Sequence, residues 1–338
     1  MKTPMPDIVG NQGLRRRLCD DVLNNSLPHA YIIAGPKGSG KHSIATQFAA
    51  AVACENKHDP NAPIPCSRCL SCRKILDGKS PDLITVKKDG LSVKIGQIRE
   101  LQTDVRIVPN DLDDKFYIIE DAQTMTSEAQ NAFLLTLEEP PSFVHFFLLC
   151  ESSEPLLETV RSRAPVLRTE PISADDIREH LVNTDADAAN LARLSPEAFS
   201  DLLAIADGSI GRALELVNDK ERKPLVARRK MAEDLVDFAR FKKNTELIRL
   251  INEMPQKPDE LSPVLTTACV VLRDLIALKQ SEGAPLCFYT DREAATEKAY
   301  GSSISTLLTL YDAITEAADD LSKNVNVKLT LTAMIAKL

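Results

Sequence analysis

Two groups of residues that can do chemistry follow each other in the first quarter of the chain. Residues 35–43 read GPKGSGKHS. Gly35, Gly38 and Gly40 let the backbone turn tightly and point its N–H groups inward, and Lys41 places an ammonium beside them. The apolar run 31–34 predicts a buried strand before this loop, and the pattern of 44–52 predicts a helix after it. Strand, glycine loop, lysine and helix form the context of a phosphate-binding loop, and the helix N-terminus favours anions. The alternative is a glycine-rich turn without a ligand.

Two departures from the usual motif argue against ATP hydrolysis. The residue after Lys41 is normally Ser or Thr, whose hydroxyl binds Mg²⁺, and here it is His42. Imidazole is a poor ligand for a hard cation that prefers oxygen. The apolar run 116–119 predicts a second buried strand that ends in Glu120 and Asp121, the reverse of the usual Asp-Glu order. Because side chains alternate across a strand, this reversal changes the direction of both carboxylates. The loop therefore fits nucleotide binding better than turnover.

The second group consists of four cysteines, with eleven, two and two residues between them. They are Cys54, Cys66, Cys69 and Cys72. A C-x-x-C spacing lets two sulfurs share one ion, and four thiolates together predict a closed, structural zinc site rather than a catalytic one. The loop between them holds several prolines and few apolar residues, so zinc would supply roughly 10–16 kcal/mol of apparent organising energy. Disulfides in a secreted domain are the alternative, but the N-terminus has no apolar signal region.

The elements that position these groups alternate over residues 1–165. Strands are expected at 31–34, 82–86, 116–120, 144–150 and 166–168, and helices at 12–25, 41–53, 95–105, 126–138 and 155–161. Such alternation predicts a parallel sheet covered by helices on both faces. Residues 166–220 predict a small helical group with helix starts at Ser173 and Ser195. Residues 221–338 predict a further helical domain, broken near 255–263 and 283–285. The fold class is thus α/β followed by all-α, in three domains.

Composition limits the function classes. The chain has 338 residues, 43% hydrophobic and 27% charged, with no apolar run that approaches the length of a transmembrane helix. The net charge of −8 argues against strong non-specific binding of nucleic acid by the chain itself. We therefore expect a cytoplasmic protein without membrane association; if it acts on DNA, it would do so through partners.

Several segments resemble the clamp-loader family of bacterial DNA polymerase III, an AAA+ family. The resemblance rests on the following segments: 27–31 (LPHAY) before the loop, the four-cysteine insertion, 129–141 (AQNAFLLTLEEPP), 159–164 (TVRSRA), 208–214 (GSIGRAL) and 324–329 (NVNVKL). It implies a RecA-like AAA+ domain with a zinc insertion at 54–72, a helical lid, and a C-terminal collar domain for oligomerisation. The position of Ala164 usually holds a cysteine in the family.

The departures at His42 and at Glu120 and Asp121 resemble the family's delta prime branch more than its gamma or tau motor subunits. This resemblance implies a part in DNA replication, in loading the beta sliding clamp onto primed DNA. The implied partners are the gamma or tau subunits, delta, the beta clamp and primed DNA, within the DNA polymerase III (nucleotidyltransferase) holoenzyme. The implied cofactor is structural Zn²⁺. ATP binding is compatible with the motif, and no ATPase turnover of its own is expected.

The resemblance also assigns roles to two arginines. Arg163, in the Ser-Arg segment, would reach in trans into the ATP site of a neighbouring motor subunit, where a guanidinium offers a planar, permanently charged fork to phosphate. The alternative is an ordinary surface ion pair. Arg212 would correspond to the sensor arginine of the family's nucleotide site, or to an arginine on a solvated helix face.

Three other functions stay open at this stage. The first is an ATP-hydrolysing motor of the gamma or tau type. The second is a zinc-dependent nucleic-acid-binding module, against which the acidic composition argues. The third is a small-molecule kinase on a phosphate loop, for which the sequence shows no substrate lid.

Overall fold

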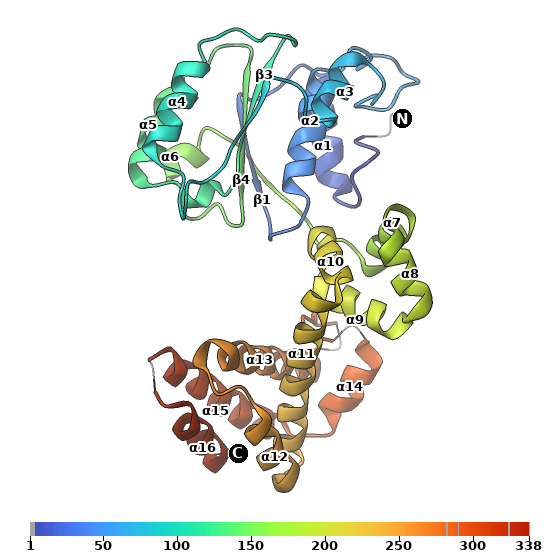
Figure 1. Ribbon diagram of the computed structural model, residues 1–338, viewed down its shortest axis with the longest axis vertical. Helices are drawn as coiled ribbons and strands as arrows, with labels where there is room; N and C mark the ends of the chain where they lie inside the picture. The colour runs from blue at the N-terminus through green and yellow to red at the C-terminus, as the bar shows by residue number, and fades with distance from the viewer. Residues whose placement is uncertain (1–3, 282, 290, 324, 338) are drawn as a thin grey trace. The chain divides into compact units, whose positions relative to one another are not determined.

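The computed structural model describes residues 4–281, 283–289, 291–323 and 325–337. Its N-terminal part contains a five-stranded sheet in which every pairing is parallel, in the order β2-β3-β4-β1-β5 (Figure 1). The strands are β1 (Ala30–Ala34), β2 (Leu83–Val86), β3 (Lys115–Ile119), β4 (Val144–Cys150) and β5 (Val166–Arg168). All five strands lie within about two residues of their predicted positions. This difference is no larger than the usual uncertainty in assigning where a strand begins and ends.

Helices cover both faces of this sheet, as the alternation of elements predicts. One face carries α1 (Gln12–Leu23), α2 (Lys41–Val52) and α3 (Leu70–Leu76), and the other carries α4 (Ile95–Asp104), α5 (Ser127–Glu138) and α6 (Glu158–Arg161) (Figure 1). A short 3₁₀ helix, η1 (Ala122–Thr124), follows β3. The sequence did not predict α3, and α6 begins three residues later than its predicted start at 155.

The sheet is buried on both faces because successive residues of its strands enter two different cores. In β1, Tyr31 and Ile33 pack with α1 and α2, whereas Ile32 packs with α5. A strand whose side chains alternate between two helical layers must be apolar throughout. This requirement explains why the run 31–34 shows no polar positions.

A buried carboxylate holds the loop before β3 to the start of β2. The Asp82 side chain is 0% exposed and accepts backbone hydrogen bonds from Asn110, Asp111 and Leu112, with N···O distances of 2.7, 2.7 and 3.0 Å. Because a buried carboxylate needs such donors, the three bonds fix the approach of β3 to the sheet edge.

We expect Asp82→Asn to lower the free energy of unfolding by about 3 kcal/mol, because an amide group turned toward the same N–H donors leaves buried groups unpaired. Urea denaturation of the whole chain measures the change. The matched control is Asp89→Asn, since Asp89 only pairs with Lys94 on the surface and should cost less than about 1 kcal/mol. Equal losses for the two variants would contradict the structural role of Asp82.

Four helices follow the sheet: α7 (Ala174–Thr184), α8 (Ala186–Leu194), α9 (Pro196–Ala206) and α10 (Ile210–Val217). The Ser173 side chain caps α7 by accepting from the Asp176 N–H at 3.1 Å, and Pro196 opens α9 after Ser195, so both predicted starts are confirmed. Residues 1–186 and 208–214 contact one another and form one compact unit. Residues 187–207 and 215–338 form a second compact unit. The division into three domains at 165 and 220 stays a prediction.

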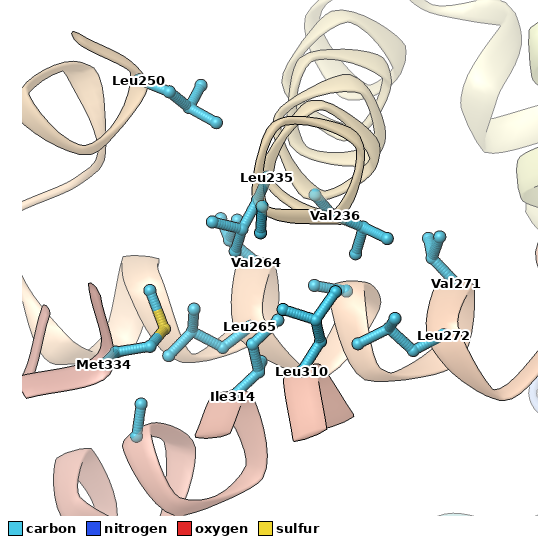
Figure 2. Close-up of a cluster of buried hydrophobic side chains, with 14 of the residues drawn as sticks. Leu235, Val236, Leu250, Val264, Leu265, Val271, Leu272, Leu310, Ile314 and Met334 are labelled. Carbon is cyan, nitrogen blue, oxygen red and sulfur yellow. The ribbon is translucent and has the colours of Figure 1, made fainter. Parts of the chain in front are cut away.

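The second unit contains six further helices around an apolar core. They are α11 (Asp219–Arg240), α12 (Asn244–Glu253), α13 (Pro258–Gln280), α14 (Arg292–Tyr300), α15 (Ile304–Ser322) and α16 (Val327–Lys337). Figure 2 shows Leu235 of α11, Leu265 of α13 and Leu310 of α15 in this core. The predicted all-α character of this region is confirmed. Asn324, part of the segment 324–329 used for the resemblance, lies outside the described residues.

The predicted helix break near 255–263 is shorter in the structure than in the sequence analysis. Helix α12 ends at Glu253 and α13 already begins at Pro258, so Pro263 lies inside α13. A proline at this position removes one backbone hydrogen bond. The neighbouring Leu261, Val264 and Leu265 are buried in the core, and their packing holds the helix through the proline.

By length and composition, α13 could cross a membrane, contrary to the expectation that no apolar run approaches that length. Its apolar window has a mean hydropathy of 1.7, and half of the window is buried within the protein. Its buried positions include Leu272 and the carboxylate of Asp274, which accepts from the Phe288 N–H at 2.7 Å. Helix α13 is the central core helix of its unit, and core helices meet the same criteria.

Candidate functional site

The phosphate loop connects β1 to α2 and opens onto a cavity of about 500 Å³. Gly40 precedes the helix with φ 81°, and no side chain caps the first turn of α2. The N–H groups of such a first turn have no partner inside the helix, so they remain available to an anion. Gly38, with φ 77°, lies so close to Ser209 that an added Cβ would fall 2.4 Å from the serine Oγ. Gly35, Gly38, Gly40 and Lys41 are therefore placed as the motif predicts.

Lys41 is folded back onto its own loop. Its Nζ donates to the carbonyl oxygens of Gly35 and Pro36 at 2.7 and 2.8 Å. Burial lowers the pKa of the ammonium, because desolvation disfavours its charged form. Carbonyl oxygens bind an ammonium less strongly than phosphate does. Lys41 can therefore exchange these partners for an anion in the cavity.

The residues that would hold a metal ion are already paired with one another or with a lysine. His42 Nδ1 lies 2.9 Å from Glu120 Oε1, and Asp121 Oδ2 lies 3.0 Å from Lys88 Nζ. The sequence analysis pointed to His42, Glu120 and Asp121 separately. The structure brings His42 and Glu120 together and adds Lys88, which no motif marks. Mg²⁺ needs oxygen ligands in near-octahedral arrangement, and an imidazole in contact with Glu120 does not provide them.

Glu151 and the start of α10 also line the cavity. Glu151 follows β4 directly and lines the cavity, so it places a carboxylate close to the start of the loop. The Gly211 N–H donates to the Gly38 carbonyl at 3.1 Å, which fixes the start of α10 to the loop. Arg212 is exposed and is not among the residues that line the cavity. Its predicted contact with nucleotide stays a prediction.

The four predicted cysteines form one cluster. Their sulfur atoms all lie within 4.8 Å of one another; Cys54, Cys66 and Cys72 are buried and Cys69 is half-buried, and none forms a disulfide. The Cys69 and Cys72 N–H groups donate to the sulfurs of Cys66 and Cys69, each at 3.4 Å. The hydrogen bond from Cys72 lowers the pKa of the Cys54 thiol, and the same bond raises the pKa of Cys72. Four mutually close sulfurs fit tetrahedral Zn²⁺.

The cysteine module is anchored to the main core rather than to a core of its own. Ile64 and Ile75 are fully buried and belong to the same apolar cluster as Phe48 of α2. The Met5 N–H donates to the Ile64 carbonyl at 2.6 Å, which ties the N-terminal segment to the module. A change in the cysteine cluster would therefore disturb the packing of α2, the helix that follows the phosphate loop.

Arg163 lies on the surface, outside the cavity of its own chain. Its side chain is 36% exposed, and its guanidinium donates to Glu138 Oε1 at 2.7 Å and to the Thr159 carbonyl at 3.0 Å. Glu138 ends α5 and belongs to the segment 129–141 that carries the resemblance. An exposed pair of this kind contributes about 0.2–1 kcal/mol, so it holds the guanidinium without trapping it.

The parallel sheet order, the phosphate loop after β1 and the acidic end of β3 define an AAA+ phosphate-loop fold, so the predicted fold class is confirmed. The family described as "DNA polymerase III, delta subunit" matches residues 10–173. The chain is 27% identical over 315 residues to DNA polymerase III subunit delta' of Bacillus subtilis, covering 92% of this chain and 91% of that one. These similarities confirm the predicted resemblance to the clamp-loader subunits of bacterial DNA polymerase III and support the predicted clamp-loader role.

The similarity to two tau subunits covers less of the chain. The chain is 32% identical over 215 residues to Bacillus subtilis subunit tau and over 216 residues to Escherichia coli subunit tau, in both cases over 63% of this chain. It spans only 37% and 32% of those two relatives. Among solved structures, a gamma subunit-related protein of Thermotoga maritima matches 94% of this chain at 16% identity with a TM-score of 0.43. The Bacillus subtilis clamp loader delta protein matches 95% at 12% identity with a TM-score of 0.39.

Proposed function

We propose that this chain acts as a delta-prime-type clamp-loader subunit that lends Arg163 to the ATP site of a neighbouring motor subunit. The observation that carries this proposal is the place of Arg163, exposed and outside its own cavity, on a pair weak enough to exchange. A γ-phosphate offers a guanidinium far stronger charge-assisted hydrogen bonds than the carboxylate and carbonyl it would leave.

The chain does not hydrolyse ATP itself under this proposal. Metal-assisted phosphoryl transfer needs a hydroxyl and a carboxylate on Mg²⁺ and a second carboxylate on the attacking water. His42 replaces the hydroxyl and pairs with Glu120, and Asp121 pairs with Lys88. Glu151 would also repel the charge that develops on the transferred group.

The remaining parts of the proposal follow from the family. The partners are the gamma or tau subunits and delta, the assembly loads the beta clamp onto primed DNA, and the site of action is the cytoplasm. The collar role belongs to α11–α16. The four cysteines hold Zn²⁺ as a structural ion, because their cluster leaves no ligand position for a substrate.

We expect the purified chain to release phosphate from ATP no faster than its Lys41→Ala variant. Lys41 contributes to ATP hydrolysis only where Mg²⁺ is bound. In a site that does not bind Mg²⁺, Lys41→Ala should therefore change the rate of phosphate release by less than about twofold. A phosphate-release assay with a motor subunit as positive control measures both rates. Turnover by the wild-type chain that Lys41→Ala abolishes would contradict the proposal and favour the motor alternative.

A further inference from the structure

The His42–Glu120 pair closes the metal position of this site while the rest of the site stays open. His42 stands in the first turn of α2 and Glu120 directly after β3, so the pair joins the two elements that would share Mg²⁺. At 2.9 Å, the His42 ring nitrogen contacts the Glu120 carboxylate oxygen directly. Since Asp121 is also paired with Lys88, neither carboxylate at the end of β3 is unpaired.

The groups that bind phosphate itself do not depend on a metal. The uncapped first turn of α2 offers N–H donors, and Lys41 is held only by two carbonyl oxygens of its own loop. Both devices act on phosphate by charge and by hydrogen bonding. The same cavity is lined by Ile8, Ile172 and Leu214, apolar side chains of the kind that contact a nucleobase. The donor set thus fits a nucleotide and does not fit its magnesium complex.

Charge then decides how many phosphates the cavity accepts. Without Mg²⁺, the negative charge of the ligand must be balanced by Lys41 and Lys37, both of which line the cavity. Glu151 lines it too, and the Gly35 N–H donates to the Cys150 carbonyl at 3.0 Å, which places the residue next to Glu151 against the loop. A third phosphate would add charge where a carboxylate already stands, in a partly desolvated cavity. A diphosphate avoids this repulsion.

We propose that the cavity binds a nucleoside diphosphate free of metal, with the His42–Glu120 pair in the place of Mg²⁺. This proposal rests on one part of the proposed function, namely that the chain does not hydrolyse ATP itself. The bound diphosphate would then act as a fixed structural ligand of the loop and of the start of α10, which the Gly211–Gly38 hydrogen bond already joins.

Calorimetric titration of ADP into the full-length chain tests this proposal directly. One titration contains Mg²⁺, and the other contains a chelator that removes Mg²⁺ but leaves the zinc bound to the cysteines. Wild-type affinity should differ by less than about threefold between the two conditions, and ATP should bind at least about tenfold more weakly than ADP without Mg²⁺. In His42→Thr, which frees Glu120 and restores a hydroxyl, Mg²⁺ should tighten ADP binding at least about tenfold. His58→Thr, the same change at an exposed histidine of the cysteine module, should behave as wild type.

Three results would overturn the proposal. They are a wild-type affinity that Mg²⁺ raises about tenfold or more, a preference for ATP over ADP without metal, and no ADP binding by a chain whose circular dichroism shows it folded. None of these results tests the proposed role of Arg163 at a neighbour's ATP site, which is tested by a separate experiment. The wild-type titration does not require any variant to fold.

Discussion

Replacing Arg163 by alanine lowers ATP turnover at the neighbouring subunit's site by on the order of 10³-fold, the lower end of what an arginine supplied in trans contributes. In the proposed role, the guanidinium would supply charge-assisted hydrogen bonds to the transferred phosphoryl group, and alanine would supply none. The exposed pair with Glu138 adds at most about 1 kcal/mol to the stability of the free chain, so the variant folds normally. The effect on turnover is therefore catalytic and not a loss of structure.

The measurement uses a reconstituted complex in which the motor subunits lack their own corresponding arginines, so that Arg163 is the remaining donor. The matched control is Arg161→Ala, which removes an exposed arginine two residues away and should change turnover by less than about twofold. Wild-type turnover by the Arg163→Ala complex would remove the proposed role. Equal losses from both variants would point to general surface charge instead.

We expect Cys72→Ser to abolish zinc binding by the four-cysteine cluster and to unfold the cysteine module. Apparent zinc-binding energies of roughly 10–16 kcal/mol are typical of structural sites, so the module loses most of what organises it. Cys72 is fully buried and stands in α3, where a serine oxygen is a much weaker ligand for zinc. We expect the zinc content to fall from about one ion per chain to none, and amide protection to vanish over residues 54–78.

Native mass spectrometry and hydrogen exchange measure these two effects. The control is Cys269→Ser, which lies in the other unit and keeps a hydroxyl within reach of Thr315, at a sulfur–oxygen distance of 3.6 Å in the wild type. It should retain the zinc and the protection of the module. A wild-type chain purified without zinc, or a Cys72→Ser chain with full protection over 54–78, would show that no metal organises this segment.

The sheet, its order of elements and the four-cysteine cluster follow from the sequence because each depends on a local pattern. A strand buried on both faces must be apolar throughout, and the C-x-x-C spacings bring the sulfurs of Cys66, Cys69 and Cys72 together locally, with Cys54 eleven residues upstream as the fourth thiol. The glycine loop with Lys41 is predicted for the same reason, since its geometry is set within a few residues.

The pairings across the fold could not be predicted in this way. His42 meets Glu120, Asp121 meets Lys88, and Arg163 meets Glu138 only because distant elements pack together. Helix α3 is missed because its seven residues are too short for a clear apolar period and its start is set by the Cys69 side chain, which accepts from the Cys72 N–H. Pro263 misled the sequence analysis since core packing outweighs a single lost hydrogen bond.

We propose above all that this chain completes the ATP site of a neighbouring subunit and does not hydrolyse ATP at its own phosphate loop. An experimental structure of the assembled clamp loader with a non-hydrolysable ATP analogue tests it most directly. We predict that the Arg163 guanidinium has left Glu138 and lies within hydrogen-bonding distance of the neighbour's γ-phosphate, while His42 and Glu120 remain paired and no Mg²⁺ is bound beside them. A guanidinium far from every triphosphate, or a Mg²⁺ ion coordinated between α2 and β3 of this chain, would contradict the claim.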